Sequence, residues 1–220
     1  MIQWLKQVSL FDKLNDAQLE QILRIAQRRS FAAGSTLFKE KDPGDIFYVV
    51  LSGSIKLFTR SAGGDEKVLS VVAAGDSFGE LSLLDGLPRS ASAQTLEPTL
   101  VLEIPSAGFM KLLQEHFDIT KGILAELSRR LRQTNEHVND LTFLDDRTRV
   151  MKNLIQLANQ HGKRDGVFIR IRLALNYDEL AQMAGVSKQV LSDVLRELEA
   201  KGVLAFGHNE YTLDLTKLRG

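Results

Sequence analysis

The residues best suited to chemistry in this chain lie between positions 78 and 91, in the stretch Phe-Gly-Glu-Leu-Ser-Leu-Leu-Asp-Gly-Leu-Pro-Arg-Ser-Ala. The carboxylate of Glu80 can accept a hydrogen bond from a hydroxyl, and Arg89 offers a planar fork of donors to phosphate oxygens. Because Gly79 lacks a Cβ, the backbone can approach a ligand, and amides at the start of the following turn can face an anion. The stretch therefore suits a small ligand with sugar hydroxyls and a phosphate, although an ordinary surface turn can contain the same residues.

The elements expected around this stretch are short strands. Segments rich in β-branched and aromatic residues alternate with turns of glycine, proline and aspartate, a pattern typical of an antiparallel sandwich or barrel. We expect strands at residues 36–38, 46–51, 55–59, 67–72, 92–95 and 99–104, after a helical region over residues 1–29. The candidate ligand site would thus lie on a β-rich domain.

A long helix is predicted from residue 118 to about residue 144, after a shorter one over residues 106–117. Its apolar positions repeat every seven residues in two rows, as in the seam of a coiled coil. The first row is Leu124, Leu131 and Val138, and the second is Leu127, Thr134 and Leu141. A helix packed on its own domain needs a similar stripe, but the length and the strict repeat favour a dimer. The polar Thr134 needs a partner, which can be the other helix or a ligand.

The region after residue 145 contains the sharpest local pattern. Asp145 is a candidate cap for a helix over residues 147–160, and a polar loop over residues 161–166 then leads to a strand over 167–172. Two helices follow at 177–184 and 187–201, with Gly185 at the turn between them.

Asn176 and Ser187 can cap these two helices, and buried positions fall at the spacing of a helix-turn-helix, which we favour over an ordinary helical hairpin. A hairpin over residues 203–213, with His208 in its turn, would be a wing.

The second helix of this helix-turn-helix would then enter the major groove of DNA. Its candidate DNA-binding residues are Ser187, Lys188, Gln189, Ser192, Asp193 and Arg196. Lys188 can reach a guanine edge or a phosphate, and Gln189 can pair with adenine. Asp193 can accept from cytosine, orient Arg196 or simply face solvent.

Composition narrows the function classes. The chain has no cysteine, so it holds no disulfide, thiolate zinc site or cysteine-ligated iron–sulfur cluster of its own. Residues 1–145 carry 16 Lys and Arg against 19 Asp and Glu, whereas residues 146–220 carry 12 against 9, a weakly basic balance that suits an anionic partner. We see no signal peptide and no membrane span, and expect a soluble cytoplasmic protein without a membrane partner.

In this order of parts, the chain resembles the cyclic-AMP receptor protein/fumarate-nitrate-reduction regulator family of bacterial transcription factors. The resemblance rests on residues 78–84 with 88–91, on 128–131 through 143–145, and on 185–187. It implies an α+β fold with three parts. These are a cyclic-nucleotide-binding β-roll (residues 1–117), a dimerisation helix and hinge (118–145) and a winged helix-turn-helix (146–220). It also implies a homodimer, double-stranded DNA and RNA polymerase as partners, and no catalytic residue, metal or cofactor.

The resemblance also implies roles for single residues. In cyclic-AMP-binding members, the residue matching Glu80 holds the ribose hydroxyl, those matching Arg89 and Ser90 hold the cyclic phosphate, and Gly79 contributes backbone. Thr134 and Asn135 match a pair that contacts the base, one from each subunit, although Asn135 replaces the usual serine. The candidate ligand-binding residues are Gly79, Glu80, Leu81, Ser82, Arg89, Ser90, Arg130, Thr134 and Asn135. We expect Arg89→Ala to abolish nucleotide binding and to leave the fold intact.

Several alternatives stay open. The effector can be cyclic AMP, as we expect, or a cyclic dinucleotide, or the regulator can be active without a ligand. The reading helix departs from the cyclic-AMP receptor pattern at Lys188, Gln189 and Asp193, so no DNA sequence preference is carried over. A regulatory subunit of a kinase or channel would share the ligand segment but would need no helix-turn-helix. A cupin-like metalloenzyme is a remote alternative, because it needs clustered His and carboxylate ligands, and none of the four histidines falls in the expected β region.

Overall fold

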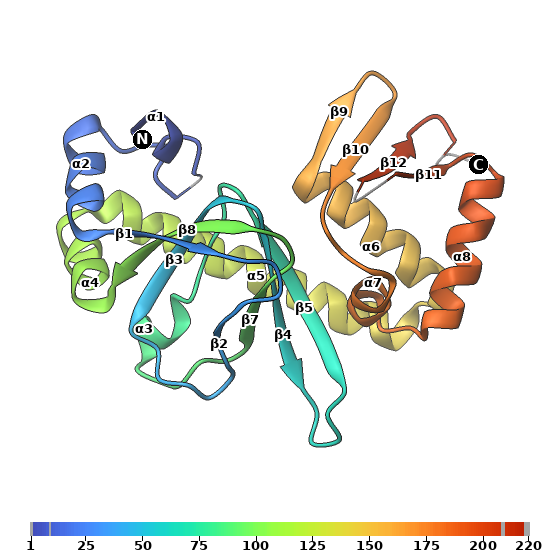
Figure 1. Ribbon diagram of the computed structural model, residues 1–220, viewed down its shortest axis with the longest axis horizontal. Helices are drawn as coiled ribbons and strands as arrows, with labels where there is room; N and C mark the ends of the chain where they lie inside the picture. The colour runs from blue at the N-terminus through green and yellow to red at the C-terminus, as the bar shows by residue number, and fades with distance from the viewer. Residues whose placement is uncertain (1, 9, 208–209, 218–220) are drawn as a thin grey trace. The chain divides into compact units, whose positions relative to one another are not determined.

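The computed structural model describes residues 2–8, 10–207 and 210–217 and contains both helices and sheets (Figure 1). The chain divides into two compact units. The first consists of Met1–Thr59 and Leu69–Asn135, and the second of Arg60–Val68 and Glu136–Gly220.

The first unit contains antiparallel sheets, as the sequence predicts, and two four-stranded sheets are formed in this part of the chain. One sheet has the order β1-β8-β3-β6 and the other β2-β7-β4-β5, and the strand pairs with an assigned register are antiparallel. The strands of the first sheet are β1 (Gln27–Phe31), β8 (Thr99–Pro105), β3 (Ile46–Ser52) and β6 (Ser77–Phe78). Those of the second are β2 (Thr36–Phe38), β7 (Ser92–Thr95), β4 (Ser54–Arg60) and β5 (Glu66–Ala73).

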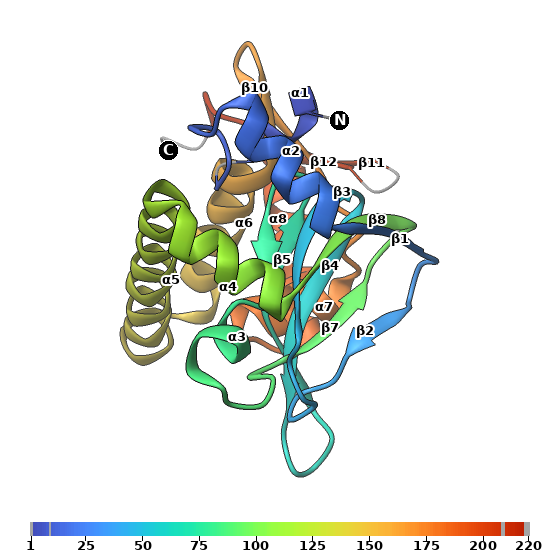
Figure 2. The ribbon, with the colours of Figure 1, turned by 90° about the vertical axis from the view of Figure 1, so that its left-hand side faces the viewer.

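Strand β3 explains how the core is built. Successive side chains of a strand point to opposite faces, and β3 is buried on both, which fits its unbroken apolar sequence. Tyr48 and Val50 pack in a cluster with residues of β4, β6, β7 and β8, whereas Phe47 and Val49 pack in a second cluster with residues of the helices. These helices are α1 (Ile2–Leu5), α2 (Asp16–Ile25), α4 (Ser106–Glu115) and the start of α5 (Phe117–Phe143). Helices α2 and α4 lie beside β8 (Figure 2).

The N-terminal region, expected to be helical over residues 1–29, is only partly helical. Helix α2 begins after Asn15, which forms a capping box with Gln18, but it ends at Ile25. Strand β1 follows and pairs with β8, from Gln27 opposite Glu103 onward. Most of β1 is exposed, so this edge strand lacks the apolar alternation that would reveal it. Met1 and Ser9 lie outside the described residues.

The second unit contains α6 (Asp146–His161), α7 (Tyr177–Ala184), α8 (Lys188–Ala200) and a four-stranded sheet of order β11-β12-β10-β9. The strands are β9 (Gly162–Asp165), β10 (Phe168–Arg172), β11 (Leu204–Gly207) and β12 (Glu210–Asp214). The expected caps are all formed: Asp145 accepts from Thr148 N, Asn176 from Glu179 N and Ser187 from Val190 N.

One loop prediction in this unit is wrong. The polar residues 161–166 do not form a loop, because 162–165 form β9 and pair with β10. Lys163, Arg164 and Asp165 are all exposed, and such an edge strand has no buried face to mark it in the sequence. The turn predicted around His208 falls on residues 208–209, which lie outside the described residues.

Candidate functional site

The predicted ligand segment connects β6 to β7 through α3 (Leu81–Asp85). Gly79, at its start, has φ of 86°, in the left-handed region that side chains rarely adopt. A Cβ at this position would lie 2.8 Å from Nη1 of Arg89 and 3.2 Å from the carbonyl oxygen of Ile46. Glycine is therefore required here both for the backbone conformation and for the close approach of Arg89.

Arg89 is held inside the first unit at three points. Its Nη1 donates to the carbonyl oxygen of Gly79 (2.9 Å), and its Nη2 donates to that of Ile46 (2.8 Å). The guanidinium lies over the ring of Phe38, 4.2 Å from the centroid. Burial lowers the pKa of Arg89 from its ordinary value, but a guanidinium keeps its proton in proteins. Arg89 is thus a fixed positive charge with only 4% of its surface exposed.

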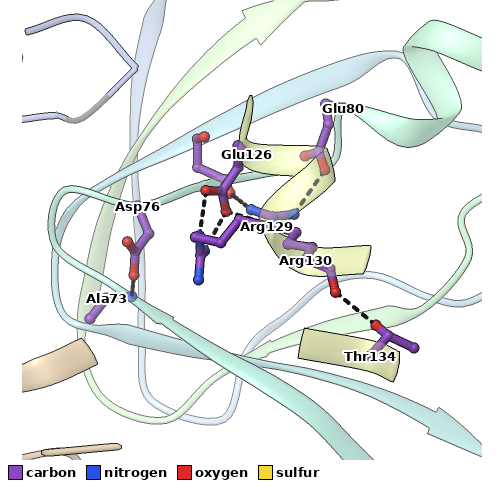
Figure 3. A network of polar contacts seen from close by, with 8 residues as sticks. Ala73, Asp76, Glu80, Glu126, Arg129, Arg130 and Thr134 are labelled. Carbon is purple, nitrogen blue, oxygen red and sulfur yellow. Dashed lines mark hydrogen bonds and ion pairs between the residues drawn. The ribbon is translucent and has the colours of Figure 1, made fainter. Parts of the chain in front are cut away.

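Glu80 is the matching buried carboxylate, with 3% of its surface exposed. Its Oε1 accepts from Nη1 of Arg130 at 2.8 Å (Figure 3). Arg130 lies on α5 and also donates to the carbonyl oxygen of Ser77 (2.6 Å) and to Oε1 of Glu126 (2.8 Å). The guanidinium therefore connects the ligand segment directly to the long helix.

A second group of contacts continues along α5. Glu126 accepts from Arg129 as well as from Arg130. Burial raises the pKa of Glu126, but the hydrogen bonds from the two arginines outweigh this effect and hold it below the ordinary value. Thr134, one turn after Arg130, donates to the carbonyl oxygen of Arg130 at 3.0 Å (Figure 3). Thr134 and Asn135 are exposed.

A pocket in the first unit brings seven of the nine predicted ligand residues together. About 350 Å³ of it is free of atoms, part of this space being open to solvent. Its predicted lining residues are Gly79, Glu80, Leu81, Ser82, Arg89, Ser90 and Arg130. Thr134 and Asn135 are not among the lining residues.

Two atoms in this pocket's lining residues lack a partner. Oε2 of Glu80 and Nε of Arg89 are buried, and neither has a hydrogen-bond partner within the described part of the chain. Buried polar atoms are almost always paired, because an unpaired one loses its bonds to water without compensation. The first atom is an acceptor and the second a donor. Together they can hold a ligand that offers a hydroxyl and an anionic oxygen.

The sequence reasoning missed the apolar part of the pocket. Phe38, Leu57, Phe78 and Ala91 also line it. Phe38 lies on β2, and its contact with Arg89 joins residues 51 positions apart, so no local pattern reveals it. Alternation along β2 and β4 predicts that Phe38 and Leu57 face inward. It does not tell whether an inward-facing residue lines a pocket or packs in the core.

The predicted seam of α5 is largely uncovered. The exposed fractions are 58% for Leu124, 62% for Leu131, 55% for Val138 and 44% for Leu141. Phe117, seven residues before Leu124 and 76% exposed, extends the first row and was missed, because the prediction placed it in the preceding helix. Leu127 differs from the others, since it packs against the core of its own unit. Exposed apolar rows of this length are typical of interaction surfaces.

The helix pair α7–α8 has the geometry of a helix-turn-helix. Gly185 ends α7 with φ of 66°, and Ser187 caps α8. The buried residues of α8 are Leu191, Val194, Leu195 and Leu198, which leaves the opposite face of the helix to solvent. On α8, Lys188 is exposed and forms an ion pair with Asp178 of α7 at 2.8 Å.

The remaining predicted DNA-binding residues are placed as follows. Gln189 donates to Asp193, with distances of 3.0 and 3.2 Å to the two carboxylate oxygens. Asp193 thus contacts Gln189 on its own helix, and its roles toward cytosine and Arg196 stay predictions. Arg196 is exposed, and Ser192 is half-buried rather than exposed.

Comparison with protein families defines the class of protein. Residues 28–116 match the family model of the cyclic nucleotide-binding domain, and residues 148–220 match that of the Crp-like helix-turn-helix domain. The chain thus combines a cyclic nucleotide-binding domain with a DNA-binding domain.

Curated relatives match over most of their length. The chain is 31% identical to the CRP-like cAMP-activated global transcriptional regulator of Mycobacterium tuberculosis over 198 residues, which is 90% of this chain and 88% of the relative. It is 34% identical to the cyclic AMP receptor protein of Thermus thermophilus, with the same coverage. The chain therefore belongs to the CRP/FNR family of transcription factors and is a CRP-like cyclic-nucleotide-binding transcription regulator.

Solved structures agree with this assignment. The catabolite activator protein of Thermus thermophilus is 32% identical, with a TM-score of 0.57 over 96% of this chain and 95% of the other. The c-di-GMP-responsive global regulator CLP of Xanthomonas campestris is 25% identical, with a TM-score of 0.74 over 91% of this chain and 99% of the other.

Other function classes gain no support. Family members are transcription regulators, not enzymes. In the described part of the chain, no three His, Asp or Glu side chains gather where they could hold a metal ion. None of the described helices has the length and apolarity needed to cross a membrane.

Proposed function

We propose that this protein is a homodimeric regulator whose DNA binding is controlled by a cyclic mononucleotide, with cyclic AMP as the expected effector. The main support is a pair of buried atoms in residues that line one pocket, Oε2 of Glu80 and Nε of Arg89. Neither has a hydrogen-bond partner among the residues that the structure describes. A ribose hydroxyl can donate to the first, and a cyclic phosphate can accept from the second. Ser90, an exposed residue of the pocket lining, can add a hydroxyl for the same phosphate.

The charges of the pocket favour this class of ligand. Arg89 supplies a buried positive charge for the phosphate, whereas the carboxylate of Glu80 is already paired with Arg130. The named relatives from Mycobacterium tuberculosis and Thermus thermophilus are cyclic-AMP proteins, which supports the same choice.

A route from the pocket to DNA follows from Arg130. Because this side chain contacts both Glu80 and Glu126, a ligand that binds Glu80 changes the surroundings of α5. We propose that the base of the ligand then contacts Thr134 of one subunit and Asn135 of the other. A ligand shifts the protein toward the DNA-competent state only if it binds that state more tightly.

The exposed rows of α5 supply the dimer in this proposal. Two copies of the row Leu124, Leu131 and Val138 would bury each other in a seam. A dimer places two α8 helices in successive major grooves, about 34 Å apart. Lys188, Gln189 and Arg196 would then contact phosphates and base edges, while RNA polymerase is a further expected partner.

The effector assignment is tested by calorimetric titration of the full chain with cyclic AMP, cyclic GMP and cyclic di-GMP. We expect saturable binding of cyclic AMP with one site per chain, and loss of that binding in Glu80→Ala. Absence of binding by all three ligands would refute the proposed pocket. Binding of cyclic di-GMP alone would favour the second candidate, a regulator that responds to a cyclic dinucleotide, which the similarity to CLP makes the specific competitor.

A further inference from the structure

The loop between β2 and β3 encloses Arg89 at both ends of the residue. Lys41 N donates to the carbonyl oxygen of Arg89, and Arg89 N donates to that of Asp42, both at 2.8 Å. Ile46, at the other end of the loop, accepts from the guanidinium at 2.8 Å. The backbone and the charged group of Arg89 are therefore both positioned by residues 41–46.

The loop is itself held in place. Asp42 accepts from Lys39 N through Oδ2, and the carbonyl oxygen of Asp45 accepts from Ser106 N at 2.7 Å. Lys41 has φ of 72° and is, among the described residues, the one non-glycine residue with positive φ. A lysine adopts this conformation at an energetic cost, so the surrounding contacts must maintain it. These contacts include the two backbone bonds to Arg89.

Gly44, within this loop, also lies close to the ligand segment. A Cβ at Gly44 would overlap the Cβ of Ser82 and would lie 2.7 Å from its Oγ and 3.1 Å from Nε of Arg89. Nε is the donor that has no partner in the described structure. Gly44 is not among the residues that line the pocket, but its neighbours Ser82 and Arg89 are. Its φ is outside the positive range, so a side chain would meet contacts rather than backbone strain.

We propose that Gly44 is a positioning residue for ligand binding. Its missing side chain lets the loop close behind Ser82 and keeps Arg89 aligned with the anionic group of the ligand. This inference rests on the proposed function, since it concerns the same pocket. Any side chain at position 44 must displace Ser82 or Arg89, and binding groups lose function when they move by more than about half an ångström.

The test is a double-mutant cycle in the full chain. Cyclic AMP affinity is measured by calorimetry for the wild type, Gly44→Ala, Ser82→Gly and the double variant, and folding is checked by circular dichroism. We expect Gly44→Ala to weaken binding about tenfold or more, which corresponds to loss of one hydrogen bond to a charged group. In the Ser82→Gly background, the side chain that the added methyl group would strike is absent. The penalty of Gly44→Ala should therefore fall at least about threefold there.

Gly63→Ala is the matched control, because its Cβ would lie no closer than 3.6 Å to any atom and its φ is outside the positive range. This variant should bind like the wild type. If Gly44→Ala fails to fold, recovery of folding and binding in the double variant supports the proposal. Unchanged affinity in Gly44→Ala, or an equal penalty in both backgrounds, overturns it. If the wild type itself binds no nucleotide, the proposed function fails instead.

Discussion

Replacement of Arg89 by lysine separates the geometry of this side chain from its charge. Lysine keeps the positive charge but loses the fork, so it cannot bond to both carbonyl oxygens and also supply the donor that Nε offers. A hydrogen bond to a charged group contributes about 1.5–3 kcal/mol, so we expect nucleotide affinity to fall about 10- to 150-fold.

The same substitution has a second, independent consequence. Gly79 and Ile46 each present a buried carbonyl oxygen to Arg89, and at least one of the two would lose its partner. An unpaired buried acceptor costs about 1–3 kcal/mol of the free energy of unfolding. The structure thereby changes the expectation for Arg89→Ala, which would lose both bonds and cannot be neutral for the fold.

The assay is calorimetric titration with cyclic AMP, together with urea unfolding of the unliganded protein. Arg29→Lys is the matched control, since Arg29 lies in the same unit, is 60% exposed in its side chain and pairs with Glu103 at 3.4 Å. Lysine keeps the positive charge beside Glu103, and Arg29 is not among the pocket-lining residues. This control should therefore leave nucleotide affinity unchanged and should lower the unfolding free energy less than Arg89→Lys does. Affinity of Arg89→Lys within about twofold of the wild type would refute the role of the fork in anion binding.

Three further predictions address other parts of the account. Because the pKa of Glu126 is held below its ordinary value of 4.5 in the folded state, its contribution to stability is present above that pH and is lost as the pH falls through the folded pKa. In urea unfolding, the wild type should therefore lose more free energy of unfolding than Glu126→Gln between pH 5 and pH 3. Equal losses would contradict the stabilising contacts of Glu126 with Arg129 and Arg130. Leu131→Glu, which places two like charges in the proposed seam, should convert the dimer to a monomer in analytical ultracentrifugation, whereas the neighbouring exposed change Arg132→Glu should not. Lys188→Ala should weaken DNA binding and reduce the slope of log affinity against log salt concentration by about one per phosphate contact, hence by about two per dimer. An unchanged slope would show that Lys188 does not contact phosphates.

The features that the sequence predicts well are determined by neighbouring residues. Gly185 ends its helix in a left-handed conformation at the predicted turn, and Asn176 and Ser187 cap their helices. A cap or a turn needs only three or four consecutive residues, so its signature survives in a single sequence.

The features that the sequence does not predict join distant residues. The contact of Glu80 with Arg130 spans 50 positions, and that of Phe38 with Arg89 depends on how two strands pack. Edge strands β1 and β9 are polar, so their pairing partners, rather than their own periodicity, determine their structure. The loop around Gly44 is of the same kind, because its role is visible only when Ser82 is placed beside it.

The central claim is that ligand in the pocket controls DNA binding. It is tested most directly by selecting DNA fragments from a random pool with the full-length protein and cyclic AMP, then measuring affinity for a selected fragment with and without cyclic AMP at fixed salt. We expect the selected DNA to be an inverted repeat with half-sites about one helical turn apart. The wild type should bind it at least about tenfold more tightly with cyclic AMP than without, whereas Arg89→Lys should show no such gain at the same ligand concentration. Equal affinity of the wild type with and without cyclic AMP would contradict the central claim.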